Sequence, residues 1–563
     1  MHVASTIGDT VGTARQLLDR AATEARFAAT LLQARGPGVA AIPPHRLIQV
    51  LRDLEAYGPV GAAVAMAAAG QRGNVAIRDE RGDITFGELD RQVNAFTNAL
   101  RARGFRAGDS LGILARNHRG LYVAILAGAK LGARTLLLNT DFSGPQLADV
   151  CRREQVAVLV HDQEFAAIAA GYDAPRGRVL AWADRPATTV HGAAAGQTVA
   201  TIESLAATAP ATTPRRPGRK QRIVLLTSGT TGTPKGAPRD MKLSLAIPGG
   251  YLSKIPLRAG RTVMLAAPGF HAWGLLSSML ALGLGNTVVM QRRFDPTAVL
   301  DGLQAHRCDT LITVPVLLNR LLALGPAEIA SRDLSALRIV AVSGSALAPE
   351  LAQRATEVFG DVVYNLYGST EVAFATIATP ADLRAAPGTV GTPPHGTVVK
   401  LLDPDGNEVP PGSSGRIFVG SSIQFEGYTG GGSKEIVAGL MSTGDVGHLD
   451  GAGRLFVDGR DDDMIVSGGE NVFPREIEDL LAGHAEIVEA AVVGVEDPEF
   501  GQRLRAYVVR EPGAGLDEDV VKTFVKENLA RYKVPREVVF LDALPRNPAG
   551  KVVKRDLPAP VPD

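Results

Sequence analysis

The chain has 563 residues, more than one compact core usually holds, and we expect two or more domains. Lys plus Arg and Asp plus Glu number 59 each, and this balance argues against a polyanionic partner such as nucleic acid. The two cysteines, Cys151 and Cys308, have neither a disulfide framework nor metal-ligand spacing, which indicates a reducing compartment.

Residues 1–72 predict a helical extension. Apolar residues recur at helical spacing between Asp9 and Gln33, and two more helical stretches flank Gly58 and Pro59. Two explanations stay open for this apolar stripe: packing onto the main domain, or shallow contact with a membrane surface. The chain opens without the basic and apolar regions of a signal peptide, and no apolar run could span a bilayer. We therefore expect a cytoplasmic protein, peripheral at the membrane under the second explanation.

Residues 73–460 predict a large domain in which strands and helices alternate. Strands are expected at 75–77, 110–115, 133–138 and 156–161, helices at 83–100 and 120–131, and a loop at 185–220. Such alternation is typical of an α/β protein with largely parallel sheets flanked by helices. Residues 461–563 predict a small α+β domain, with helices at 476–481 and 520–529 and strands at 487–495 and 504–509.

A loop of small and hydroxylated residues follows the expected strand 222–226. The loop contains Thr227, Ser228, Gly229, Thr230, Thr231, Gly232 and, after a proline, Lys235. Glycines let the backbone turn its N–H groups toward a ligand, the hydroxyls donate further hydrogen bonds, and the lysine adds a positive charge. The loop can therefore bind a polyphosphate, although its spacing differs from that of P-loop NTPases.

Further segments add polar groups and small residues downstream of this loop. They are Phe270-His271-Ala272-Trp273-Gly274, Gly344-Ser345-Ala346, Tyr367-Gly368-Ser369-Thr370-Glu371, Asp445, Arg460, Asp462, Gly468-Gly469 and Gly550-Lys551. Considered one at a time, each has an ordinary structural explanation such as a surface turn or a core packing position. Their order and spacing behind the phosphate loop favour function.

Together these segments resemble the acyl-adenylate-forming family, which includes acyl-CoA synthetases, luciferases and peptide-synthetase adenylation domains. The resemblance is greatest to bacterial fatty acyl-CoA ligases, and it implies ATP, Mg²⁺ and CoA as ligands and a mobile C-terminal domain. It assigns the loop with Lys235 to the phosphates of ATP, and Thr370 to the α-phosphate. Mg²⁺ would be bound by Glu371 and Thr227. Adenine would be bound by Gly344, Ser345, Tyr367 and Gly368, and ribose by Asp445 and Arg460. Lys551 would complete the active site, Asp462 would be the hinge, and Gly468 and Gly469 would line the path of CoA.

The same resemblance places His271, Trp273, Gly274, Gly344 and Ala346 in the acyl pocket. No acidic residue lies near His271 to pair with a substrate amine, and an unpaired ammonium is costly to bury, so we expect an acid without an amino group. The small residues favour a medium- or long-chain fatty acid. We expect a stand-alone acyl-CoA synthetase that works through acyl-AMP. Two alternatives remain, a ligase that passes the acyl group to a carrier protein and a non-catalytic sensor, while oligomeric state stays open.

Overall fold

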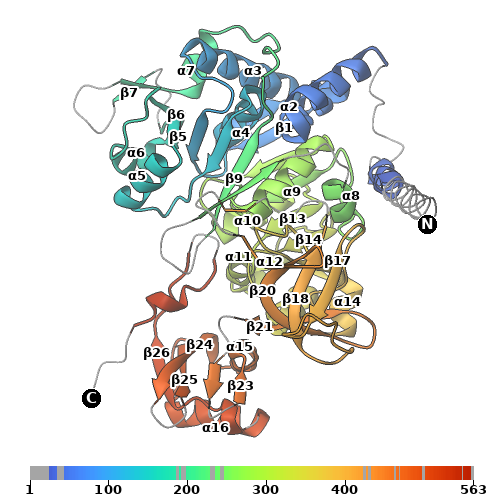
Figure 1. Cartoon of the computed structure of the whole chain (residues 1–563), viewed down its shortest axis with the longest axis vertical. Coiled ribbons are helices and arrows are strands. Elements are labelled where there is room, and N and C mark those ends of the chain that lie inside the picture. The colour runs from blue at the N-terminus through green and yellow to red at the C-terminus, as the bar shows by residue number, and fades with distance from the viewer. Residues whose placement is uncertain are drawn as a thin grey trace, which may run out of the picture.

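The computed structural model describes residues 24–34, 44–184, 189–191, 198–227, 235–240, 246–421, 427–428, 433–461, 465–467, 470–497, 501–529, 531–547 and 550–558. The protein consists of a large α/β domain and a small domain formed by the chain beyond residue 465 (Figure 1). Within the described ranges, no helix combines the length and the apolar character that crossing a membrane requires.

The first sheet of the large domain contains eight described strands, of which the inner ones run parallel. Its order is β16 (Thr376–Ala378), β15 (Val363–Tyr367), β14 (Ile339–Val342), β13 (Thr310–Thr313), β11 (Thr262–Leu265), β12 (Thr287–Met290), β1 (Val75–Asp79) and β2 (Gly82–Thr85). Only β16 and β2, at the two edges, pair antiparallel. All four residues of β13 and of β14 are buried, as expected for parallel strands covered by helices on both faces.

The second sheet contains six described strands and carries the predicted phosphate loop at one edge. Its order is β10 (Lys235–Asp240), β9 (Arg222–Thr227), β4 (Arg134–Leu137), β3 (Ser110–Leu114), β5 (Val156–Asp162) and β6 (Arg178–Trp182). The strands are parallel except β10, which returns antiparallel to β9 and pairs Lys235 with Thr227. Thr227, which precedes the predicted phosphate loop, and Lys235, which follows it, therefore lie opposite each other in the sheet.

Two further sheets are mainly antiparallel. One completes the large domain with β17 (Val398–Leu402), β18 (Gly415–Gly420), β20 (Leu440–Leu449), β19 (Ile436–Val437) and β21 (Leu455–Arg460). The other forms the small domain with β23 (Glu470–Val472), β22 (Ile465–Ser467), β25 (Gly501–Arg510), β24 (Ile487–Asp497) and β26 (Glu537–Leu541). The small-domain sheet packs beside α15 (Pro474–Ala482) and α16 (Glu518–Asn528) (Figure 1).

Helices cover the sheets of the large domain. They are α2 (Pro44–Gln71), α3 (Phe86–Ala102), α4 (Arg119–Leu131), α5 (Gly144–Arg153), α6 (Ala166–Ala169), α7 (Ile202–Ala207), α8 (Ala246–Leu252), α9 (Ala272–Gly283), α10 (Pro296–Ala305), α11 (Pro315–Leu322), α12 (Pro326–Ala330), α13 (Pro349–Phe359) and α14 (Pro380–Ala385). Several begin at a side-chain cap, as α3 does where Thr85 and Glu88 form a reciprocal capping box.

The N-terminal helix α2 packs into the core of the large domain. It is kinked at Gly58, whose φ of 72° departs from the helix just before Pro59. Beyond the kink, Val60 and Val64 belong to the same buried cluster as Phe86 of α3. This contact supports the packing explanation for the apolar stripe of α2.

Two sequence predictions differ from the structure. Residues 83–85, expected to begin a helix, form the end of β2, and α3 begins at Phe86 because Thr85 caps it. Within residues 185–220, expected to be a loop, the chain forms α7, β8 (Thr198–Ala200) and β7 (Thr189–His191). The capping box between Thr201 and Ser204, which starts α7, is too short a signal to stand out among alanines and threonines. The predicted largely parallel sheets of the large domain are confirmed, and the mainly antiparallel sheet after residue 397 was not part of the prediction.

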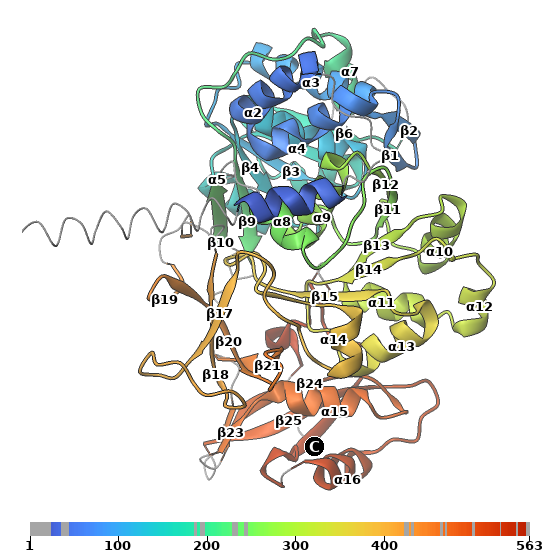
Figure 2. The ribbon, with the colours of Figure 1, turned by 90° about the vertical axis from the view of Figure 1, so that its right-hand side faces the viewer.

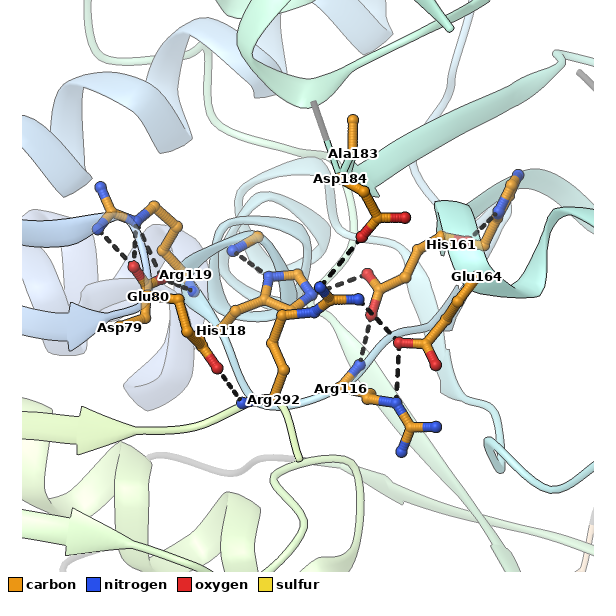
Figure 3. Close-up of polar contacts among 12 residues, drawn as sticks. Asp79, Glu80, Arg116, His118, Arg119, His161, Glu164, Ala183, Asp184 and Arg292 are labelled. Atoms are coloured by element: carbon orange, nitrogen blue, oxygen red, sulfur yellow. Dashed lines mark hydrogen bonds and ion pairs between the residues drawn. The ribbon is translucent and has the colours of Figure 1, made fainter. Parts of the chain in front are cut away.

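Ion pairs join the two parallel sheets (Figure 3). Asp79, at the end of β1, receives the backbone N–H of Arg119 at 2.9 Å and its guanidinium at 2.6 Å, where Arg119 begins α4. Arg292, which follows β12, donates to Glu164 at 2.8 Å and to Asp184 at 3.2 Å on the side of the six-stranded sheet. Because the Asp79 side chain is fully buried, loss of its arginine partner would leave an uncompensated charge between the sheets.

The loop from β3 to α4 makes further contacts between the two parallel sheets. His118 caps α4 by accepting the N–H of Gly120, and its other ring nitrogen lies 2.8 Å from Asp162 (Figure 3). The neighbouring Asn117 donates to the carbonyl of Ala267 at 2.9 Å and accepts the N–H of Gly269 at 2.6 Å. One loop of the six-stranded sheet thereby holds the segment that precedes His271 in the other sheet.

The small domain packs against the large domain through α15 and through its last loop (Figure 2). A Cβ on Gly483, at the end of α15, would lie 3.5 Å from a carboxylate oxygen of Glu350 in α13. A Cβ on Gly550 would lie 2.3 Å from Val316 in α11, and Gly550 has a φ of 78°. Only glycine fits this close, left-handed turn, which places Lys551 beside the large domain.

Candidate active site

A cavity lies where the carboxyl ends of strands from both parallel sheets meet. Its described lining consists of Leu137 at the end of β4, Asn139 after it, Leu225 and Leu226 in β9, Phe270, His271 and Ala272 after β11, and Thr370 after β15. Crevices at the carboxyl ends of parallel strands are the usual ligand sites of α/β proteins. Of the described lining residues none is acidic, and His271, Asn139 and Thr370 supply the polar groups.

His271 lines this cavity and carries an unsatisfied polar group. It occupies the N-cap position of α9, but its side chain makes no capping hydrogen bond. Its Nε2 is buried and has no hydrogen-bond partner among the described residues. Burial lowers the pKa of His271 to about 4, so the imidazole is neutral at neutral pH. A buried nitrogen without a partner costs free energy that a ligand group could recover.

Other residues assigned to the acyl pocket lie outside the described lining of this cavity. Trp273 packs in the core, stacks on Tyr251 and donates its indole N–H to the carbonyl of Thr313 at 2.8 Å. A Cβ on Gly274 would lie 2.2 Å from the carbonyl oxygen of Pro268, so this glycine permits the turn that precedes α9. Gly344, with a φ of 102°, and Ala346 are exposed in the loop after β14, and Ser345 between them is half-buried.

A tyrosine and an aspartate form the centre of the predicted nucleotide site. Tyr367 ends β15 and donates its hydroxyl to Asp445 Oδ2 at 2.5 Å. Asp445 lies opposite Arg460 in the β20–β21 pair, and a guanidinium nitrogen of Arg460 is 3.5 Å from Asp445 Oδ1. Burial raises the pKa of Asp445, while the Tyr367 hydrogen bond and the positive charges of Arg460, Lys551 and Lys434 partly offset this rise.

Lys551 and Lys434 add positive charge around this carboxylate. The backbone N–H of Lys551 donates to Asn547 Oδ1 at 2.9 Å, which shapes the last loop, and the Lys551 side chain is exposed. The Nζ of Lys434 lies 3.0 Å from where a Cβ on Gly444 would be. Three cations around one carboxylate leave an excess of positive charge that suits a polyanion such as ATP. Sequence reasoning missed Lys434, because a lysine in a glycine-rich segment carries no signal until the strands are paired.

Glu371 is the carboxylate that the sequence suggested for Mg²⁺. Its side chain is buried, with 7% of the residue exposed, and its Oε1 accepts the hydroxyl of Tyr428 at 2.8 Å. Ser369 holds the turn, because its Oγ accepts the backbone N–H of Glu371 at 3.2 Å. No arginine, lysine or histidine in the described part of the chain pairs with Glu371. A buried carboxylate with a neutral donor, and with no cationic partner among the described side chains, fits a divalent ion.

Several predicted site residues lie outside the described residues or are described only by their backbone. Ser228, Gly229, Thr230, Thr231, Gly232, Asp462, Gly468 and Gly469 belong to the first group, and Thr227 and Lys235 to the second. Thr227 and Lys235 form the last residue pair between β9 and β10. Leu225 and Leu226, which line the cavity, directly precede Thr227 in β9. Gly368 is half-buried after β15, and a Cβ there would lie 2.1 Å from the carbonyl of Ala373. In the described residues searched, no group of three or more His, Cys, Asp or Glu could hold a metal ion.

Comparison with known proteins identifies two matching family models. Residues 64–429 match the model of the AMP-binding enzymes, and residues 476–551 match that of the AMP-binding enzyme C-terminal domain. An indoleacetate–CoA ligase of Aromatoleum aromaticum is 34% identical over 86% of this chain and 94% of its own. A fatty acid–[acyl-carrier-protein] ligase of Streptomyces coeruleorubidus is 30% identical over 84% of this chain and 91% of its own.

Solved structures agree with these sequence matches. The o-succinylbenzoate CoA synthetase of Bacillus subtilis, in complex with its acyl-adenylate intermediate, superposes with a TM-score of 0.75. It is 26% identical, and the alignment covers 89% of this chain and 98% of that one. The similarity therefore extends over both the large and the small domain.

Proposed function

The chain belongs to the family of AMP-binding enzymes, and from this premise we propose that it is an ATP-dependent acid–CoA ligase. The observation that carries the proposal is the grouping of Tyr367 and Arg460 around the carboxylate of Asp445, with Lys551 adding positive charge to it. Cations that exceed the local carboxylate charge suit the phosphates of a nucleotide. The cavity lined by Thr370, three residues after Tyr367, also has leucine and phenylalanine among its described lining residues, and these suit the organic part of an acid.

The reaction proceeds in two steps. In the first, a carboxylate oxygen of the acid attacks the α-phosphorus of ATP, the bond to the β-phosphate oxygen breaks, and pyrophosphate leaves. In the second, the sulfur of the CoA thiolate attacks the acyl carbon of the adenylate, the bond to the phosphate oxygen breaks, and AMP leaves. Neither step demands a side-chain base for the acid itself, so positioning and charge stabilisation supply most of the catalysis.

The residues divide between the substrates. Lys551, Thr370 and Lys235, with the loop from Thr227 to Gly232, contact the phosphates and the reacting carboxylate. Tyr367, Gly368, Gly344 and Ser345 hold adenine, and Asp445 with Arg460 holds ribose. Mg²⁺, held by Glu371 with Thr227 nearby, would neutralise phosphate charge. Gly468 and Gly469 border the path of CoA, and Asp462 is the hinge between domains that meet at residues 460 and 461.

The acid is one without an amino group and with an apolar body. The neutral state of His271 and the absence of acidic groups from the described lining support this choice, because a buried ammonium would find no partner there. A medium- or long-chain fatty acid remains the narrower proposal from the sequence. The relatives named above act on an aromatic acid in one case and on a fatty acid in the other, so both classes belong in the test.

ATP–pyrophosphate exchange with a panel of fatty, aryl and amino acids tests the first step, and AMP release with CoA tests the second. We expect exchange with fatty or aryl acids, no exchange with α-amino acids, and AMP release that depends on CoA. Exchange without CoA-dependent release would favour transfer to a carrier protein instead. Binding of ATP without exchange for any acid would favour a sensor and contradict the proposed ligase.

A further inference from the structure

A hydrogen bond connects the predicted metal carboxylate to a distant segment of the chain. The hydroxyl of Tyr428 donates to Glu371 Oε1 at 2.8 Å, although the two residues are 57 positions apart. Tyr428 lies between β18 and β19 of the antiparallel sheet, whereas Glu371 lies in the turn after β15 of the parallel sheet. The bond therefore connects two sheets of the large domain at the proposed nucleotide site.

The donor is suited to a carboxylate that must keep its charge. A phenol hydroxyl is a neutral hydrogen-bond donor at neutral pH. A neutral hydroxyl restrains one oxygen and leaves the charge of the carboxylate in place, whereas a lysine or arginine would neutralise that charge. The negative charge stays available to a cation at the other oxygen.

We propose that Tyr428 is a positioning residue that holds Oε1 of Glu371 and so directs Oε2 toward a divalent cation bound with ATP. This inference rests on the proposed function, in which Glu371 holds that cation. Hydrogen bonds to the free atoms of a metal ligand fix its orientation, and their loss commonly weakens metal binding by about tenfold or more. In this proposal Tyr428 acts through Glu371 and is therefore a positioning residue, not a catalytic residue.

The experiment measures binding of Mn²⁺ by electron paramagnetic resonance in the presence of a non-hydrolysable ATP analogue. Tyr428→Phe removes the hydroxyl alone, and we expect Mn²⁺ affinity to fall about tenfold. Tyr172→Phe is the matched control, because Tyr172 also donates a 2.8 Å hydrogen bond, to the carbonyl of Val156, inside another cluster of the large domain. Equal affinities in the parent and Tyr428→Phe, or equal losses in the two variants, would overturn the inference.

A double-variant cycle separates this inference from the assignment of Glu371. Glu371→Gln should weaken Mn²⁺ binding, and adding Tyr428→Phe to it should cause no further loss, since the hydroxyl then has no metal carboxylate to hold. Independent losses would overturn the role of Tyr428 while leaving Glu371 in place. Unchanged Mn²⁺ affinity in Glu371→Gln would instead contradict the metal assignment of the proposed function. Thermal unfolding without metal confirms that each variant is folded.

Discussion

The hydroxyl of Tyr367 lies 2.5 Å from the carboxylate of Asp445 and so ties β15 of the parallel sheet to β20 of the antiparallel sheet. The two residues were assigned to different parts of the nucleotide, adenine and ribose. Their contact means that the two recognition elements are placed by one bond, and that neither can shift alone.

Replacement of Tyr367 by phenylalanine tests this contact. The ring is kept, so stacking on adenine survives, while Asp445 loses a hydrogen bond of the charge-assisted kind. Such bonds contribute roughly 1.5–3 kcal/mol, and we expect the KM for ATP to rise about tenfold or more with little change in the KM for the acid. Tyr364→Phe, on the same strand, is the control and should leave both constants unchanged. A Tyr367→Phe enzyme that binds ATP as the parent does would show that this contact is dispensable.

Lys434 is expected to contribute to nucleotide binding. It places a positive charge beside Gly444 and Asp445, and its removal should raise the KM for ATP roughly two- to fivefold, as for other partly exposed charges. The effect should shrink at high salt, because screening weakens an exposed charge. Lys400→Ala serves as the control, since Lys400 belongs to the same sheet but pairs with Glu408. Equal effects of the two substitutions would assign the change to overall charge.

Lys551 and Asp462 should separate the two half-reactions. The charge of Lys551 acts on Asp445, so the last loop of the small domain lies near the proposed nucleotide site. Lys551→Ala should slow acyl-AMP formation by about 10²–10³, yet still convert supplied acyl-AMP and CoA into thioester. Asp462→Pro should do the reverse, because proline fixes φ and a hinge must change it.

Assays of both variants in both half-reactions, with synthetic acyl-AMP for the second, provide the comparison. If both lose the same half-reaction, alternation between two domain positions is wrong for this protein. Asp462 lies outside the described residues, so its role rests on its place in the sequence alone.

His271 should make stability depend on pH. The pKa of the folded side chain, about 4, lies below the ordinary value of 6.5, so the unfolded chain binds a proton that the folded protein does not. The free energy of unfolding therefore falls as pH is lowered from 6.5 to about 4, by at most about 1.4 kcal/mol per pH unit from this residue. His271→Gln should remove this contribution to the pH dependence of the free energy of unfolding, which is measured by urea unfolding at several pH values within this range. His395→Gln, at an exposed position, should not, and identical slopes for all three proteins would contradict the buried neutral imidazole.

The sequence was informative wherever structure is local. Strands such as β3 and β5, and helices such as α4, follow from short apolar runs and helical periodicity, and the parallel sheets follow from their alternation. Contacts that join distant segments gave no such signal. Tyr428 meets Glu371 only because two sheets far apart in the chain pack together. Lys434 lies beside Gly444 only because β19, which follows Lys434, pairs with β20. The family resemblance assigned Trp273 and Gly274 to the acyl pocket. Both residues are buried in the structure, and their assignment to the pocket stays a prediction.

The contact between α15 and α13 sets carboxylates near one another. Burial, followed by the negative charges of Glu478 and Glu350, raises the pKa of Asp479 to about 6, although Arg475 opposes this rise. Surfaces made for permanent attachment are mostly apolar at their centre, whereas here acidic groups share the contact. Above about pH 6 the ionised Asp479 adds a negative charge near Glu350, which Arg475 offsets only in part, and this like-charge contribution lowers the work of separating the two surfaces. Under the proposed alternation of the small domain between two positions, a contact that is easy to undo would favour turnover.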